Sequence, residues 1–272
     1  MAPAIAHFLV GASLLLLLVV PVALRYDVDR ELALWLIPIG GVWGLIPDVH
    51  HITPVFEAEL YALHNTPWAD LFAFHYTLDR PAIRARYLES VFGSILLFIC
   101  SVAVFWGSTH SNAAGRRAWH RSRRIATLVA IVGATAYATV ALGVLVSVQD
   151  AFPAVALLVG AHSTLVGGLL LVALGAGLGV VYAVGFGAMA LLGVEGGPWT
   201  AVGLGAAFGG ATWLGGVVIA LPLWLRVVAD VTLAVPFLHA GSFVALVGYG
   251  VVFGGVYSLV GSSPSRKLPA GS

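Results

Sequence analysis

Long apolar runs separated by short polar segments fill this chain from end to end. A bilayer core about 30 Å thick needs roughly 20 residues of helix, because each residue adds 1.5 Å. Runs of that kind cover residues 3–24, 31–47, 87–107, 123–148, 161–192, 199–224 and 236–261. The pattern predicts an all-α, polytopic transmembrane helical bundle of about seven helices. A half-helix over 153–160 would add an eighth crossing, so the number of crossings between residues 150 and 195 stays open.

Composition supports lipid as the solvent. With 60% hydrophobic and 9% charged residues, the chain has too little polar surface to coat a water-soluble globule. The single cysteine, Cys100, excludes a multi-cysteine metal site. We expect no haem, flavin or nucleotide, because a Cys-x-x-Cys-His motif and a Gly-rich phosphate loop are missing. Nucleic acid is not an expected partner, since membrane topology and anionic lipid account for the basic run 116–124.

Arginines orient the predicted helices, because basic loops stay in the cytoplasm. The segment 108–124 carries five of them, Arg116, Arg117, Arg121, Arg123 and Arg124. Placing this segment inside predicts a multi-pass protein of the cell membrane with its N-terminus outside and its C-terminus cytoplasmic. Arg80, Arg84 and Arg86 then fall in an outer loop, where we expect them to snorkel at the start of the third helix.

The chain divides by pattern into two regions. Residues 1–122 form an N-terminal three-helix region with a polar loop over 48–86, and residues 123–272 form a C-terminal four-helix region. Gly133-Ala134-Thr135 recurs 77 residues later as Gly210-Ala211-Thr212, and His162 recurs at the same spacing as His239. These matches suggest two repeated helical hairpins with parallel orientation.

Glycines four residues apart lie within several of the predicted helices. Examples are Gly175 with Gly179, Gly205 with Gly209, and Gly250 with Gly254. Such pairs let helices approach closely in lipid. They favour a compact bundle, or contact with a second copy or a membrane complex, besides the membrane lipids themselves.

Candidate chemistry gathers in residues 48–79 and at the start of the first helix. On a helical path Asp48 and His51 lie three apart, and His75 and Asp79 lie four apart, so each pair projects from one face. The predicted topology brings five side chains to the same outer surface: His7, Asp48, His51, His64 and His75.

These five are our candidate ligands for a divalent metal, zinc or manganese, since imidazoles and carboxylates are usual ligands for such ions. A further carboxylate would orient a ligand histidine or act as general base, and the candidates for this catalytic role are Asp70 and Glu57. The alternative is a solvated surface loop that simply contains several polar residues and interfacial histidines.

Two segments carry a family resemblance. The first is His-Phe-Leu-Val-Gly (7–11), and the second is Gly-Leu-Ile-Pro-Asp-Val-His-His (44–51). They resemble the membrane-bound metal-dependent hydrolases, which begin with a His-x-x-x-Gly helix and carry a Pro-Asp-hydrophobic-Asp-His motif after the next helix. The resemblance covers about the first 80 residues and implies metal binding by His7, Asp48 and His51. His50 stands where the family has its second aspartate, and His64-Asn65 and His75-Tyr76 are loose counterparts of its downstream histidine elements. In style the chain also resembles uncharacterised multi-span proteins of halophilic archaea.

Two functions follow as hypotheses. One is a metal-dependent hydrolase that acts at the outer membrane surface on a lipid or other amphiphile. The other is a non-catalytic membrane protein, either a transport or channel subunit or a scaffold of a membrane complex, which the glycine-rich helices and the dearth of buried charge favour.

Overall fold

The predicted helices are present in the protein. The computed structural model describes residues 4–26, 28–53, 55–110, 123–191 and 197–261, and these ranges contain no β-strand. Seven spans are long and apolar enough to cross a membrane. They are α1 (Ala4–Arg25), α2 (Ala33–Leu45) with flanking 3-10 turns η1 (Arg30–Leu32) and η2 (Ile46–His51), α6 (Tyr87–His110), α8 (Arg123–Val148), α10 (Thr164–Leu191), α11 (Pro198–Thr212) continued by the π-helix η5 (Trp213–Ala220) and α12 (Leu221–Val228), and α13 (Ala240–Gly261). The chain is therefore a multi-pass integral membrane protein.

The segment that could have added an eighth crossing is short. It forms α9 (Phe152–Ala156) and the 3-10 turn η4 (Leu157–Val159). Eight residues of helix cannot cross a hydrocarbon core about 30 Å thick. Within the described ranges the bundle has the seven predicted spans.

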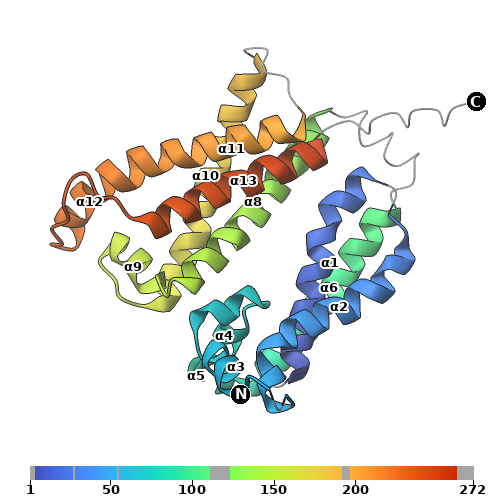
Figure 1. Ribbon diagram of the computed structural model, residues 1–272. Coiled ribbons are helices and arrows are strands. Elements are labelled where there is room, and N and C mark those ends of the chain that lie inside the picture. Colours follow the sequence, from blue (N-terminus) through green and yellow to red (C-terminus); the bar gives the residue numbers. More distant parts are fainter. Residues whose placement is uncertain (1–3, 27, 54, 111–122, 192–196, 262–272) are drawn as a thin grey trace, which may run out of the picture.

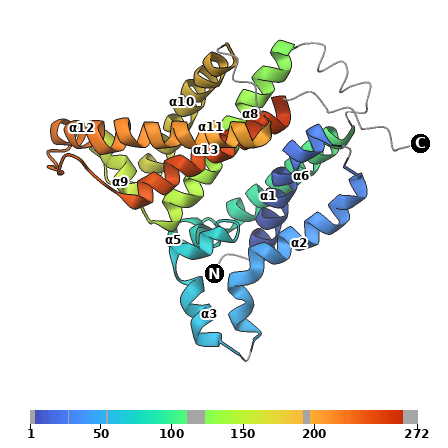
Figure 2. The same ribbon diagram turned by 45° about the horizontal axis from the view of Figure 1, so that its top comes forward.

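The spans pack as two groups (Figures 1 and 2). In the N-terminal group α1 packs against α2 and α6, and in the C-terminal group α13 packs against α8 and α11 while α10 packs against α8. Glycines make the C-terminal crossings possible: a Cβ added at Gly205 would lie 1.9 Å from the carbonyl oxygen of Gly250. A Cβ at Gly175 would clash with the Thr139 side chain of α8, and a Cβ at Gly179 would clash with that of Thr135. These glycines serve packing within the chain, while the repeat and the association of copies stay predictions.

The crossing of α1 and α2 also depends on glycine. A Cβ at Gly11 would lie 2.2 Å from the carbonyl oxygen of Gly40, and a Cβ at Gly44 would lie 2.4 Å from that of His7. The two backbones therefore touch. This contact sets the His7 end of α1 directly against the end of α2 that leads into Asp48.

The polar loop runs from α2 to α6 and contacts the C-terminal group through α8. It forms α3 (Glu57–His64), the 3-10 turn η3 (Pro67–Leu71), α4 (His75–Leu78) and α5 (Pro81–Arg84), beside the ends of α1 and α8 (Figure 2). Arg80 Nη2 lies 2.8 Å from Oδ1 of Asp150, just after the end of α8. The guanidinium of Arg80 also lies over the ring of Tyr76. Arg80, one of the three arginines that do not fit the charge rule, therefore has a carboxylate partner on the same side of the bundle.

Candidate metal centre

His75 is the centre of a buried cluster of histidines and carboxylates. Its Nδ1 lies 2.9 Å from the carbonyl oxygen of Gly44. A carbonyl oxygen can only accept, so Nδ1 carries a proton, and Nε2 presents a lone pair when the ring is neutral. That lone pair faces Asp48 Oδ1 at 3.3 Å and Asp79 Oδ2 at 4.0 Å. With a neutral ring, three electron-rich atoms thus point at one another, an arrangement that a proton on Nε2 or a bound metal ion stabilises.

Two further histidines complete the cluster around Asp79. His7 Nε2 lies 3.6 Å from Asp79 Oδ1, and His64 Nε2 lies 3.4 Å from Asp79 Oδ2. The His7 ring stacks on the His75 ring with centroids 3.9 Å apart. Asp79 therefore bridges the end of α1 and the end of α3.

The donor atoms fall into two overlapping groups that share His75. One contains His7, His75 and Asp79, and the other Asp48, His64 and His75. Within each group the ligand atoms all lie within 4.8 Å of one another. Two ligands held tetrahedrally about 2.0–2.1 Å from a zinc ion lie roughly 3.3 Å apart, close to the separations found here. The residues present fit a divalent ion.

Burial makes the cluster costly without a cation. His7, His64 and His75 are buried, whereas Asp48 and Asp79 keep 16% and 14% of their side-chain surface exposed. Several polar atoms have no hydrogen-bond partner in the described part of the chain, namely both ring nitrogens of His7, Oδ1 of Asp48, Nδ1 of His64 and Nε2 of His75. A buried polar atom with no partner at all costs about 1–3 kcal/mol, so the cluster depends on its histidine–aspartate contacts or on a bound cation. Water reaches the cluster from the carboxylate side.

The two loop histidines have opposite pKa shifts. Burial alone would lower the pKa of His75, but its polar contacts to Asp48 and to the Gly44 carbonyl, with the charge of Asp79, outweigh burial and raise this pKa. Burial lowers the pKa of His64, and positive charge on His75 and His50 lowers it further. His64 therefore favours the neutral form that binds metal, while His75 holds its Nε2 proton until a metal displaces it.

Four of the five ligands expected from sequence meet in this cluster: His7, Asp48, His64 and His75. His51 does not join them. It is exposed, and its ring lies on the outer side of His50, whose Nδ1 is 2.8 Å from the Pro47 carbonyl oxygen. The chain turns after His51, where the N–H groups of residues 52 and 53 both bond to Val49.

Asp79 is the member of the cluster missing from the expected ligand set. The signal for it was its spacing of four from His75, which places both side chains on one face of α4 and its C-cap. The loop contacts that bring His7 and His64 to Asp79 are long-range, so no local pattern shows them.

The two carboxylates expected to act in catalysis lie elsewhere. Asp70 is buried and accepts hydrogen bonds from the N–H and hydroxyl of Thr77 and from the hydroxyl of Ser147 on α8. Glu57 is exposed in the first turn of α3. Neither belongs to the two groups of donor atoms. Their catalytic role stays a prediction, and the contacts of Asp70 are those of a clamp between the loop and α8.

The backbone just before His75 is strained. Ala73 and Phe74 both have φ near +60°, a left-handed conformation that costs about 1–2 kcal/mol for each non-glycine residue. The Phe74 N–H donates to the Asp70 carbonyl oxygen at 3.0 Å. Asp70 thus holds the strained segment through its backbone and its side chain, and this sets where His75 lies.

No protein-family model, curated protein or solved structure matches the chain. The functional argument therefore rests on the cluster itself.

Proposed function

We propose that this membrane protein binds one divalent metal ion, zinc or manganese, and uses it to hydrolyse a lipid or other amphiphile at the membrane surface. The observation that carries the proposal is the placing of His75. Its Nδ1–H is fixed by Gly44, and its Nε2 lone pair is held among carboxylate oxygens and buried imidazoles. A backbone acceptor on the far nitrogen is the usual way in which proteins orient a metal-binding histidine.

We assign the ion to Asp48, His64 and His75. Asp48 lies closer to His75 Nε2 than Asp79 does. His64 Nε2 faces Asp79, which leaves its buried and unpartnered Nδ1 for the ion. Three protein ligands leave a position open, as catalytic rather than structural zinc sites do.

Asp79 and His7 then lie beside the ion. Asp79 faces both His7 and His64 and is partly exposed, so it is placed to orient His64 and to take a proton from water. When bound, a divalent ion would supply Lewis acidity, which polarises a carbonyl or phosphoryl group and lowers the pKa of water so that it loses a proton and becomes nucleophilic near neutral pH. His7, stacked on His75, holds the other oxygen of Asp79.

The location of the cluster supports an amphiphilic substrate. His7 lies one turn from the described start of α1, and Asp48 lies at the end of the α2 span. These positions correspond to the level of lipid headgroups. Around the cluster the loop exposes large apolar side chains, among them Ile52, Phe56 and Trp68, which suit an interfacial surface.

The test is hydrolysis by the full chain in nanodiscs that contain phospholipid and ester-linked amphiphiles. We expect product release that a chelator abolishes and that zinc or manganese restores. His75→Ala should be inactive, and the exposed His51→Ala should remain active. Metal binding without any hydrolysis would contradict the enzymatic part and favour the non-catalytic alternative. Hydrolysis that survives both chelation and His75→Ala would contradict the metal-dependent mechanism.

A further inference from the structure

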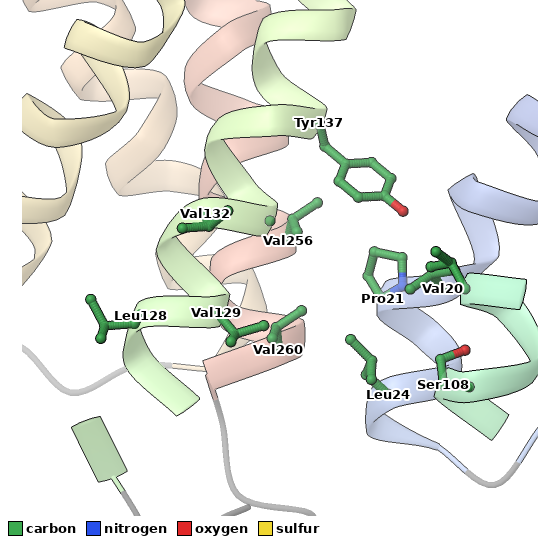
Figure 3. Close-up of a pocket in the computed structure, with 13 residues that line it drawn as sticks. Val20, Pro21, Leu24, Ser108, Leu128, Val129, Val132, Tyr137, Val256 and Val260 are labelled. Carbon is green, nitrogen blue, oxygen red and sulfur yellow. The ribbon is translucent and has the colours of Figure 1, made fainter. Parts of the chain in front are cut away.

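An apolar cavity lies between the two groups of helices, at the end of α1 opposite His7. It has a volume of about 520 Å³, within the range of ligand pockets. Its walls come from α1, α6, α8 and α13 (Figure 3), chiefly Val20, Pro21, Leu24, Val129, Val132 and Val260. Ser108 also lines the cavity, but its hydroxyl donates a hydrogen bond to the Phe105 carbonyl oxygen within the same helix.

The cavity is closed toward the middle of the bundle and open toward lipid. At its closed end the Tyr137 ring reaches across from α8, and its hydroxyl donates to the Leu17 carbonyl oxygen of α1 (Figure 3). On the open side Leu128 and Val132 remain 60% and 67% exposed. An apolar chain can therefore enter sideways from the bilayer.

A cationic group stands at the membrane-surface end of the same helix face. Arg25 ends α1 four residues after Pro21, and helical side chains lean back over the residue one turn earlier. Its Nε and Nη1 are buried and have no hydrogen-bond partner among the described residues. Buried guanidinium nitrogens without a hydrogen-bond acceptor are costly, and the planar donor fork of arginine matches a phosphate.

We infer that this cavity binds a phospholipid, with an acyl chain between α1 and α8 and the phosphate on Arg25. Charge complementarity selects this occupant, because a phosphate-bearing lipid suits the apolar walls and supplies acceptors for the two guanidinium nitrogens that lack a hydrogen bond. Tyr26, half-exposed beside Arg25, is of the residue type found at the headgroup level. The bound lipid would join the two helix groups in the leaflet opposite the metal centre, and this inference does not depend on the proposed hydrolysis.

The experiment uses the full chain in nanodiscs of phosphatidylglycerol that carries a photoreactive group on its acyl chain. Cross-linked residues are mapped by mass spectrometry. We expect labelling at Leu24, Val132 and Val260. Labels spread over the outer faces of α10 and α2, with none in the cavity wall, would overturn the inference. This result needs only the wild-type chain.

Variants separate the chain site from the phosphate site. A Cβ at Gly133, in the cavity wall, meets nothing within 4 Å, so Gly133→Leu should fill the cavity and abolish the labelling. Gly93→Leu is the matched control, because Gly93 has the same free space outside the cavity.

Arg25→Gln should weaken phospholipid retention about tenfold or more, as loss of a charged hydrogen-bond donor does. Arg30→Gln, an exposed arginine at the same end of the bundle, should not weaken it. Equal retention by Arg25→Gln, or equal competition by a phosphate-free diacyl lipid, would overturn the assignment.

Discussion

The Nδ1 of His75 lies 2.9 Å from the carbonyl oxygen of Gly44, a residue of α2 that precedes His75 by 31 positions in the chain. The Cα of Gly44 also packs against the backbone of His7, where an added Cβ would lie 2.4 Å from the carbonyl oxygen. One glycine of α2 therefore packs against one histidine of the cluster and fixes the tautomer of another. The candidate metal centre depends on the close crossing of α1 and α2.

Gly44→Ala should damage the centre without touching a ligand. The added Cβ would lie 2.4 Å from the His7 carbonyl oxygen, and overpacking of this kind costs about 1–3 kcal/mol. We expect lower thermal stability and weaker zinc binding, measured by thermal unfolding and by titration with a competing chelator. Gly168→Ala is the control, since a Cβ there meets nothing within 4 Å. Unchanged zinc affinity in Gly44→Ala would contradict the link between crossing and centre.

The two histidines around Asp79 should differ in their effect on metal affinity. In the proposed site His64 is a ligand, whereas His7 would act through Asp79, which both histidines face. We expect His7→Ala to weaken zinc binding by about 10–100-fold, as loss of an orienting partner does, and His64→Ala to weaken it more. Equilibrium dialysis of both variants against zinc decides the order. The reverse order would move the ion to the group of His7, His75 and Asp79.

Asp70 gives a prediction that separates a clamp from a catalyst. Its carboxylate holds Thr77 and Ser147 together. Asp70→Asn should lower stability by about 1–3 kcal/mol, because it leaves buried donors without an acceptor, and activity should fall with stability. Ser147→Ala should cause a smaller fall of the same kind. If Asp70→Asn abolished activity at unchanged stability, Asp70 would be catalytic, as its sequence context predicts.

Stability should depend on pH through His75, in opposite senses with and without metal. A raised pKa in the folded state means that protonated His75 stabilises the metal-free protein below the unfolded pKa, about 6.5, and that this stabilisation is lost as pH rises through the folded pKa. Metal competes with the same proton, so the stabilisation by zinc should grow as pH rises through the folded pKa.

The measurement is the unfolding temperature of wild type minus that of His75→Gln, followed against pH with chelator and with zinc. Taking the difference removes the contribution of His64, whose lowered pKa acts in the opposite sense. A difference that is flat with pH in chelator would show that His75 does not titrate between these carboxylates.

Sequence pattern predicts the helices well because lipid demands long apolar runs, and each span lies within a few residues of its expected range. It also predicts which end of the bundle holds the cluster of histidines and carboxylates. His51 is an expected member of the cluster but lies outside it, because the 3-10 turn η2 places its ring beside His50 on the exposed side. Hydropathy does not encode this detail. The clamp of Asp70 joins residues 77 positions apart in sequence, and such contacts require the tertiary fold.

Metal content tests the central claim most directly. The full chain, purified in mild detergent and dialysed against zinc, should retain about one ion per chain by elemental analysis, since the single Nε2 lone pair of His75 serves one ion. His75→Ala should retain none, and His51→Ala should retain as much as wild type. Wild type without bound zinc or manganese, or His75→Ala with as much metal as wild type, would contradict the account.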